Sequence, residues 1–402
     1  MKLVAVTRVK NELDIIEAFI RHHARHFDKV VVLDDGSSDG TYELLLQLQS
    51  IYGDVVVLRQ PTIGYEQNRY MTLLLRMAVD KFGADWVAPL DADEFIEPAD
   101  GMMLAEVLAG QRPAVYELGW SNFAWSPDLE ESAEPNPVVR QRFRLPPRPD
   151  CTKLLVHSQF VSGSVELSLG NHLLLHNGQQ FATEPLERVQ LCHYPIRSIA
   201  QYVDKIVIGY LQYLSTPDWN KMVGFQYIGP FQELAVSDLE GITRRMSEDS
   251  VFYGVEESKR ASDRPQTSEA PLNYLGGPLT LTPQGSLILP NILRHAEMMA
   301  TEFAGAAKKS REVDSLSTEN ARLRERLSEM EHEHLRQNAL QRSQLAEMRV
   351  ELERAQEKVA LQARELWSRT HRIAKRVHGA LKKVNRGVKL LADTASGRAR
   401  TM

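Results

Sequence analysis

The chain has 402 residues, of which 43% are hydrophobic and 25% are charged, and its formal net charge is −5 at pH 7. This length allows two or three domains, or one large domain with an extension. The composition is ordinary for a soluble protein, and no apolar run approaches the roughly 20 residues that a membrane-spanning helix needs. Cys151 and Cys192 form no disulfide or metal-binding pattern, which predicts reduced thiols and a cytoplasmic location.

The first hundred residues alternate between short apolar runs and helical patterns. We expect strands over 3–7, 29–33, 55–58 and 86–90, and helices over 13–23, 42–51 and 67–82. Nearly continuous apolar strands separated by helices are typical of a parallel sheet that is covered on both faces. The predicted fold class is therefore α/β, with a mostly parallel, Rossmann-like sheet.

The following segment is mixed. Prolines, six of them within 127–149, divide residues 113–215 into loops and short strands, with strands expected over 154–161 and 173–175 and a helix over 199–214. Residues 256–292 are expected to form a linker or irregular region.

Residues 293–368 are rich in Glu, Arg, Gln, Ala and Leu and predict a coiled coil, and therefore a homo-oligomer. Two heptad registers differ by four residues, which is a stutter. The first register has Asn320, Leu327 and His334 at a, with Leu316, Leu323 and Met330 at d. The second has Leu345, Leu352, Val359 and Leu366 at a, with Met348 and Ala355 at d. A single solvated helix is the alternative.

The C-terminal tail, residues 369–402, is basic. It holds ten Lys or Arg against one acid, a balance of +9, which leaves −14 for the other 368 residues. Apolar residues from Ile373 to Leu391 recur at helical spacing, which predicts an amphipathic helix on an anionic membrane surface, peripheral at the inner membrane. Packing against a partner helix is the alternative, and the acidic body argues against nucleic acid.

Asp91 and Asp93 follow the expected strand 86–90 directly. In open α/β sheets, ligands bind just outside the carboxyl ends of the strands. Two hard oxygen ligands at that place suit a divalent cation that also holds a diphosphate. Glu94 is predicted to cap this acidic turn.

The segment 34–41 follows the second expected strand in the same way. Gly36 permits a tight turn, and a helix cap accounts for residues 38–41. Neither accounts for Asp34 and Asp35, whose carboxylates can accept hydrogen bonds from a nucleobase or a ribose hydroxyl.

These motifs together resemble the family-2 glycosyltransferases of GT-A fold. The residues that carry the resemblance are 6–12, the turn 34–41 and Asp91-Ala92-Asp93, and downstream 120–123, Lys153, His172, 193–198 and Lys205, which look like one bacterial branch of the superfamily. The resemblance covers roughly residues 1–255. It implies a nucleotide-sugar-binding half over 1–112 and an acceptor half over 113–255.

The resemblance implies an inverting transfer from a nucleotide-diphosphate-sugar to a glycan, lipid or protein acceptor. A divalent cation, Mn²⁺ or Mg²⁺, would bridge the diphosphate and offset the charge on the leaving nucleotide. The donor-binding residues that it implies are Glu12, Asp34, Asp35, Asp91, Lys153 and Arg197. The metal ligands that it implies are Asp91, Asp93 and His193.

Simpler explanations exist for several of these residues. His193 could be a buried histidine that bonds to the backbone, Lys153 a surface lysine, and Arg197 a partner of Asp204. His22 and His26 are spaced for a metal on one helix, but a helix face against a strand explains them better.

An inverting transfer needs a base that takes the proton of the acceptor hydroxyl. Asp128 and Glu130 lie in a plausible acceptor loop, although a solvated acidic loop would look the same, so the base stays unassigned. Two other functions remain open: a non-catalytic scaffold with a degenerate transferase domain, or another GT-A enzyme such as a nucleotidyltransferase.

Overall fold

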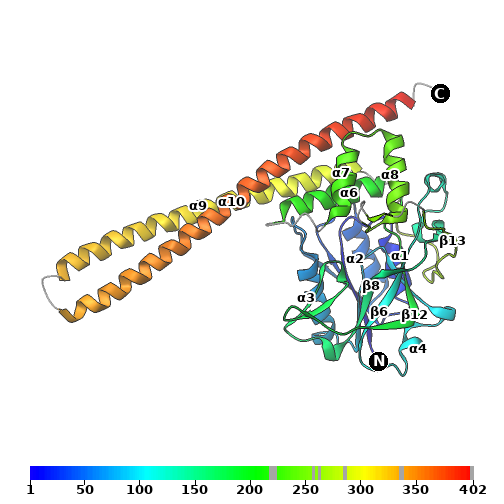
Figure 1. The fold of residues 1–402 in the computed structure, drawn as a ribbon, viewed down its shortest axis with the longest axis horizontal. Helices are drawn as coiled ribbons and strands as arrows, with labels where there is room; N and C mark the ends of the chain where they lie inside the picture. The colour runs from blue at the N-terminus through cyan, green and yellow to red at the C-terminus, as the bar shows by residue number, and fades with distance from the viewer. Residues whose placement is uncertain (217–223, 256–258, 261–263, 284–287, 335–338, 399–402) are drawn as a thin grey trace. The chain divides into compact units, whose positions relative to one another are not determined.

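The computed structural model describes residues 1–216, 224–255, 259–260, 264–283, 288–334 and 339–398. The chain divides into two compact units, Met1–His295 with Lys383–Met402, and Ala296–Lys382. Figure 1 shows a central sheet with its helices in the first unit and two long helices in the second.

Eight strands form the main sheet of the first unit. They are β1 (Leu3–Val9), β2 (Lys29–Asp34), β3 (Val55–Arg59), β4 (Trp86–Pro89), β5 (Glu94–Pro98), β6 (Val115–Asn122), β8 (Arg148–His157) and β12 (Glu184–His193). Their order is β3-β2-β1-β4-β8-β6-β12-β5. The strands β1 to β4 pair in parallel, as do β6 and β12, whereas β8 is antiparallel to β4 and β6, and β5 to β12. The predicted α/β fold with a mostly parallel sheet is confirmed.

Helices cover both faces of this sheet because the strands are apolar on both sides. In β1, Leu3 and Ala5 pack in the core beneath α1 (Ile16–His23) and α2 (Thr41–Ile51), whereas Val4 and Val6 pack beneath α3 (Gln67–Asp80). The remaining helices of this unit are α4 (Leu104–Leu108), α5 (Pro137–Arg140), α6 (Ile199–Ser215), α7 (Phe225–Leu234) and α8 (Leu239–Phe252). The remaining strands are β7 (Phe143–Arg144), β9 (Val165–Leu167), β10 (Leu174–His176), β11 (Gln179–Gln180) and β13 (Ser268–Glu269).

The strand predicted over 154–161 begins earlier and ends earlier than expected. It is β8, which starts at Arg148 and gives way to a short 3₁₀ helix at Ser158–Phe160. Since β8 pairs with both β4 and β6, the two halves predicted as 1–112 and 113–255 share one sheet. His22 lies at the back of this sheet, where its Nε2 is 2.8 Å from the Ile96 carbonyl oxygen of β5, as a helix face against a strand predicts.

The segment 272–282 is anchored to α1, where a buried carboxylate binds its backbone and Arg21 and His22 make further hydrogen bonds with it. Glu17 accepts hydrogen bonds from the backbone N–H groups of Thr280, Leu281 and Thr282 at 2.8, 3.0 and 2.6 Å. Burial acts to raise the pKa of Glu17, but these hydrogen bonds hold it below its ordinary value. Because folding lowers the pKa of Glu17, its ionised carboxylate stabilises the folded state. This stabilisation is fully present above pH 4.5, the ordinary pKa, and is lost as the pH falls through the lower pKa of the folded state.

Glu17→Gln is therefore expected to loosen this segment at neutral pH, because an amide accepts these hydrogen bonds more weakly than a carboxylate. Hydrogen exchange of the Leu281 and Thr282 amides should quicken by about tenfold or more, since the lost contacts are worth about 1.5–3 kcal/mol. The wild-type chain should show the same increase below pH 4.5. Glu43→Gln, an exposed change in α2, is the control, and equal exchange in both variants would contradict this anchor.

The second unit contains most of α9 (Ile288–His334) and the first part of α10 (Ala339–Arg398). A groove between α9 and α10 is lined by Lys309, Val313 and Leu316 of α9 and by Gln362, Glu365, Leu366 and Arg369 of α10. Further along α9, Arg324 lies 3.8 Å from Glu353 of α10. Because the partner numbers fall as the α9 numbers rise, the two helices are antiparallel (Figure 1). The two predicted heptad registers thus occupy one helix each, and the four residues between the helices, 335–338, lie outside the described residues.

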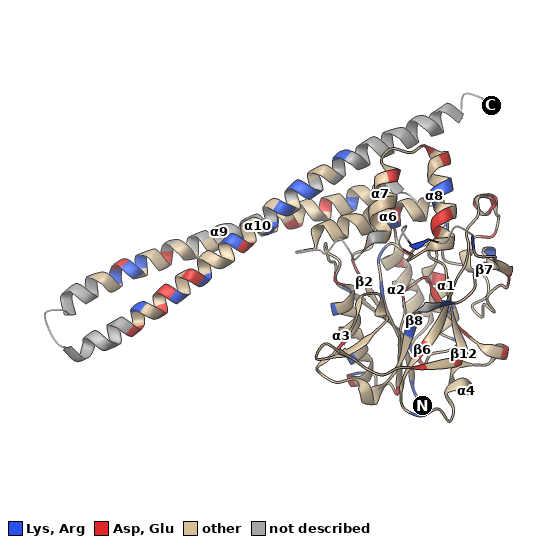
Figure 2. Cartoon of the chain, in the orientation of Figure 1, with Lys and Arg blue, Asp and Glu red and all other residues tan. Residues whose placement is uncertain are grey.

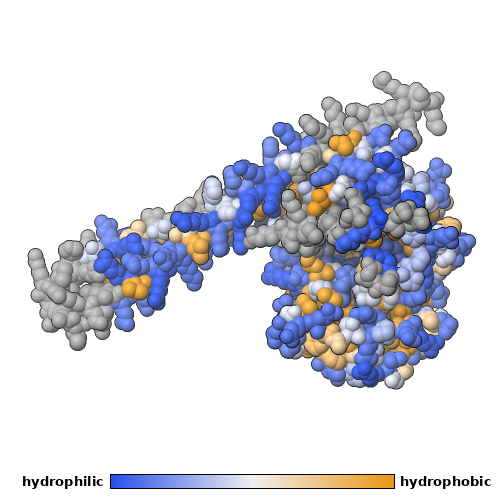
Figure 3. Space-filling view, viewed as in Figure 1, coloured by the Kyte–Doolittle hydropathy of each residue, from blue (hydrophilic) through white to orange (hydrophobic). Residues whose placement is uncertain are grey.

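Charged residues of both signs alternate along the described surface of this helical hairpin (Figure 2), with isolated apolar residues between them (Figure 3). The predicted a positions Leu327, Leu352 and Val359 are buried or half-buried, whereas the d positions Leu316 and Leu323 are 57% and 43% exposed. No helix in the described residues combines the length and hydrophobicity needed to span a bilayer. The predicted basic tail continues α10 as far as Arg398, but most of its side chains lie outside the described residues.

Candidate active site

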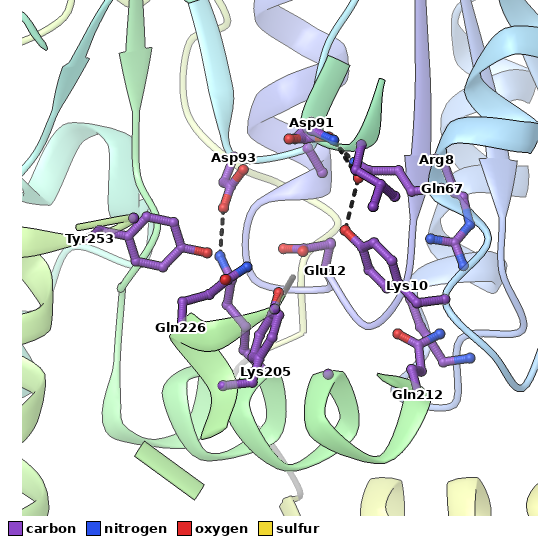
Figure 4. A pocket seen from close by; sticks show the side chains of 18 of the residues that line it. Arg8, Lys10, Glu12, Gln67, Asp91, Asp93, Lys205, Gln212, Gln226 and Tyr253 are labelled. Carbon is purple, nitrogen blue, oxygen red and sulfur yellow. Dashed lines mark hydrogen bonds and ion pairs between the residues drawn. The ribbon is translucent and has the colours of Figure 1, made fainter. Parts of the chain in front are cut away.

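A cavity of about 430 Å³ lies at the carboxyl ends of β1 and β4, between the sheet and helix α6 (Figure 4). Its size suits a small-molecule ligand. Among the described residues, the cationic side chains that line it are Arg8, Lys10, Lys153 and Lys205. The carboxylates that line it are Glu12, Asp91, Asp93 and Asp204. This alternation of charges at strand ends suits a ligand that carries both phosphates and hydroxyls.

Asp91 and Lys153 form a buried ion pair at one side of the cavity. Lys153 Nζ lies 2.7 Å from Asp91 Oδ2 and 2.9 Å from Glu94 Oε1, and its side chain is only 1% exposed. Burial acts to lower the pKa of Lys153, but the two carboxylates hold it above its ordinary value. Lys153 is therefore a buried cation, and the surface-lysine alternative is wrong. Glu94 also accepts the backbone N–H of Asp91 at 2.9 Å, so the predicted cap of the turn is confirmed.

Asp93 is the point at which three cationic or polar groups converge. Its Oδ2 lies 2.9 Å from Lys205 Nζ, 3.5 Å from His193 Nε2 and 3.7 Å from Arg197 Nη1. Burial acts to raise the pKa of Asp93, but these neighbours hold it well below its ordinary value. Asp93 is thus a carboxylate at neutral pH, although it is almost fully buried.

His193 presents an unprotonated nitrogen to this carboxylate. Its Nδ1 lies 2.7 Å from Asn122 Oδ1, so Nδ1 is the donor and Nε2 carries the lone pair that faces Asp93. Burial lowers the pKa of His193 to about 4, so the ring is neutral at pH 7. The alternative of a histidine that bonds to the backbone is wrong, because its partner is a side-chain amide.

A lone pair that faces a carboxylate is a favourable arrangement for a cation. Two ligands of one ion at about 2.1 Å each lie about 3 Å apart when they are at right angles, and the Asp93 and His193 atoms are 3.5 Å apart. In the described residues, no group of three or more His, Cys, Asp or Glu side chains could hold a metal ion. The two side chains therefore fit a cation whose other ligands come from a bound diphosphate and water.

Arg197 is enclosed by carboxylates rather than open to a ligand. Its side chain is fully buried, with Nη2 2.6 Å from Glu12 Oε2 and Nε 2.7 Å from Asp14 Oδ2. These partners, and not Asp204, pair with it, since Asp204 accepts a hydrogen bond from Asn11 at 3.0 Å instead. The structure thus brings Glu12 and Arg197 together at the cavity, with Arg197 behind Glu12.

Asp34 and Asp35 do not line the cavity. Asp34 Oδ1 accepts the Gly36 backbone N–H at 3.1 Å, so this carboxylate caps its own turn. Asp35 accepts both the backbone N–H and the hydroxyl of Thr62 at 2.6 Å and pairs with Arg8. Both side chains are fully buried. Asp35 thus fixes the position of Arg8, which does line the cavity.

Asp128 and Glu130 also lie away from the cavity, in a 3₁₀ helix over Pro127–Glu131. Glu130 Oε1 accepts the backbone N–H of Ile199 at 2.9 Å, at the first turn of α6. This contact gives Glu130 a structural task, and nothing in the structure connects Asp128 with the cavity.

Several cavity residues were not selected from the sequence for a role. Arg8 and Lys10 lie at the carboxyl end of β1, so the rule that ligands bind at strand ends could have found them. Tyr65 and Tyr213 stack at a centroid distance of 4.4 Å in the cavity wall. Tyr253, whose ring lies 5.0 Å from Lys205 Nζ, follows α8 in a region without a readable pattern.

Residues 5–151 match the family model described as "Glycosyl transferase family 2". The match supports a glycosyltransferase. It includes Glu12, Asp91 and Asp93, whereas Lys153, His193 and Arg197 lie beyond its end.

Two solved structures are similar to the chain at low identity. Staphylococcus aureus TarS 1–349 is 10% identical, with 63% of this chain and 79% of that chain covered and a TM-score of 0.31. The mannosyltransferase PcManGT from Pyrobaculum calidifontis, in complex with GDP-Man and Mn²⁺, is 13% identical, with 62% and 79% covered and a TM-score of 0.31. The fold assignment rests on the strand order and pairing of the sheet itself.

Proposed function

We propose that this chain is a metal-dependent, inverting glycosyltransferase that moves a sugar from a nucleotide-diphosphate-sugar to a glycan, lipid or protein acceptor. The observation that carries the proposal is the position of Asp93. It lies at the carboxyl end of β4, in a family-2-like segment, with its Oδ2 facing the His193 lone pair and the Lys205 ammonium. The carboxylate and the imidazole suit a divalent cation, and the ammonium beside them suits the diphosphate that such a cation binds.

The other cavity residues supply the donor site. The stacked Tyr65 and Tyr213 rings, with Arg8 5.7 Å from the Tyr65 centroid, offer an aromatic wall for a nucleobase. Lys10 and Lys205 supply positive charge for diphosphate oxygens. Asp91, whose position Lys153 fixes, can accept a hydrogen bond from a ribose hydroxyl. A divalent cation held by Asp93 and His193 would offset the charge that develops on the leaving nucleotide.

A screen of nucleotide-sugars tests this function. The full chain should be stabilised against heat by at least one UDP- or GDP-sugar in the presence of Mn²⁺, and less so with a chelator. It should release the nucleoside diphosphate from the same donor. Release of pyrophosphate from a nucleoside triphosphate would favour a nucleotidyltransferase, and no binding of any donor would favour a non-catalytic scaffold.

We also propose that the helical hairpin joins copies of this chain, because the predicted d positions Leu316, Leu323 and Met348 are left exposed. Changing Leu316 and Leu323 together to Lys should reduce the molar mass of the full chain in light scattering, since the buried apolar area of a helix seam drives association. Glu351→Lys, an exposed charge change on α10, is the control. An unchanged molar mass in the double variant would assign any association to other surfaces. We further propose that the basic tail, residues 369–402, attaches to anionic lipid.

A further inference from the structure

His172 is a cavity-lining residue in which one ring nitrogen is held by a hydrogen bond and the other, Nε2, lies beside Gly170. The residue follows a 3₁₀ helix over Leu169–Asn171, and its half-buried ring lines the cavity. Its Nδ1 lies 2.7 Å from the backbone carbonyl oxygen of Thr152 in β8. Because a carbonyl oxygen only accepts, Nδ1 carries the proton, and Nε2 of the neutral ring is an unprotonated acceptor.

The surroundings keep this ring neutral and in place. Burial and the nearby Lys153 ammonium lower the pKa of His172, with Arg148 acting in the same direction and Asp91 against it. Trp120 of β6 lies beside the ring at a centroid distance of 5.8 Å. Gly170 provides the space on the other side, since a Cβ there would lie only 2.6 Å from His172 Nε2.

The carboxylates that line the cavity are each engaged through at least one oxygen, whereas Asp204 Oδ1 is buried without a hydrogen-bond partner among the described residues. Each accepts a hydrogen bond from a neighbouring cation or amide within the part of the chain that the structure describes. The pairs are Glu12 with Arg197, Asp91 with Lys153, Asp93 with Lys205, and Asp204 with Asn11. The other cavity imidazole, His193, faces Asp93. His172 Nε2, by contrast, makes no hydrogen bond with any of the described residues.

We propose that His172 is the general base of the transfer, an inference that rests on the function proposed above. Its Nε2 takes the proton of the acceptor hydroxyl while that oxygen attacks the anomeric carbon of the donor sugar. The new C–O bond forms as the bond from this carbon to the diphosphate breaks, and the electron pair of the broken bond leaves with the nucleoside diphosphate. The proton remains on the imidazolium until solvent water removes it. Neither Asp128 nor Glu130 is needed for this step.

The test compares turnover with donor binding in the full chain. The probes are UDP- and GDP-hexoses with Mn²⁺, with water as the acceptor and release of the nucleoside diphosphate as the readout. His172→Asn keeps a donor for the Thr152 carbonyl but has no ring nitrogen in the cavity. Its kcat should fall by about 10²–10⁴-fold with the donor KM nearly unchanged, the range that a general base contributes. Added imidazole should restore part of the activity of His172→Ala. His176→Asn, which changes an exposed histidine of β10, is the matched control and should retain full activity.

Each outcome distinguishes this inference from the function on which it rests. Wild-type kcat in His172→Asn would overturn the base assignment and leave the glycosyltransferase proposal intact. A raised donor KM with unchanged kcat would show that His172 contacts the donor instead, and would also overturn it. A wild-type chain that releases no nucleoside diphosphate from any donor would contradict the proposed function, and the base assignment with it.

Discussion

Asp93→Asn is expected to abolish the Mn²⁺-dependent stabilisation of the chain by nucleotide-sugars and to lower turnover on the order of 10³-fold. The reason is that Asp93 Oδ2 faces both His193 Nε2, at 3.5 Å, and Lys205 Nζ, at 2.9 Å. A metal ligand supplies several kcal/mol of transition-state stabilisation, and about 4 kcal/mol corresponds to this loss in rate. Differential scanning fluorimetry and steady-state kinetics, each with and without Mn²⁺, measure the two effects.

The loss of a buried charge complicates this variant, because Lys205 would lose its carboxylate partner. The double variant Asp93→Asn/Lys205→Met removes both charges and should fold as the wild type does by circular dichroism, yet remain inactive. Asp100→Asn, at an exposed ion pair with Arg188, is the control and should keep its Mn²⁺ response. A folded Asp93→Asn chain with undiminished metal-dependent turnover would rule out the assignment.

Arg197→Ala is expected to lower the free energy of unfolding by about 3–5 kcal/mol, as is usual when one partner of a buried ion pair is removed. The fully buried guanidinium binds Glu12, Asp14 and the Tyr194 carbonyl oxygen, and without it two carboxylates would remain close together. Arg197 thus connects the segment that follows β12 with the segment that follows β1. Urea unfolding monitored by tryptophan fluorescence measures the change.

Arg188→Ala is the matched control, since Arg188 also pairs with a carboxylate but is 54% exposed. Exposed ion pairs contribute about 0–1 kcal/mol, so its unfolding midpoint should hardly move. The sequence predicted that Arg197 binds donor oxygens, and a donor-binding role would give a different result for a conservative substitution. If Arg197→Lys kept full stability but lost donor binding, the guanidinium would serve the ligand rather than the fold.

The first four strands and three helices were predictable because local pattern and tertiary environment agree there. Successive residues of β1 face opposite apolar layers, so Leu3 to Val6 form one unbroken apolar run. The strand-end rule likewise located Asp91 and Asp93. The rule does not predict the direction in which a carboxylate side chain points. Asp34 and Asp35 were therefore expected to bind the donor, but Asp34 binds its own turn and Asp35 binds Thr62.

Local sequence patterns could not predict contacts between segments that are far apart in the sequence. Arg197 and Asp14 are 183 residues apart, and no periodicity connects them. Asp204, seven positions after Arg197, was the nearest acid that helical spacing suggested, but Asn11 binds it. In the C-terminal helices, the heptad positions indicated helix seams, and the shift between the two registers coincides with the end of α9 at His334. Whether such a shift bends one helix or separates two depends on residues between them that carry no strong turn signal.

The anchor of segment 272–282 has a consequence for biosynthesis. Glu17 leaves the ribosome at least 263 residues earlier than the N–H groups that bind it, which belong to Thr280, Leu281 and Thr282. The cavity wall likewise extends from Arg8 to Gly254. A nascent chain that ends at residue 200 would therefore carry an open cavity, and Glu17 would lack these backbone partners while it kept Arg21. Since domains usually fold as units during synthesis, we expect this one to become protease-resistant only after residue 282 has emerged.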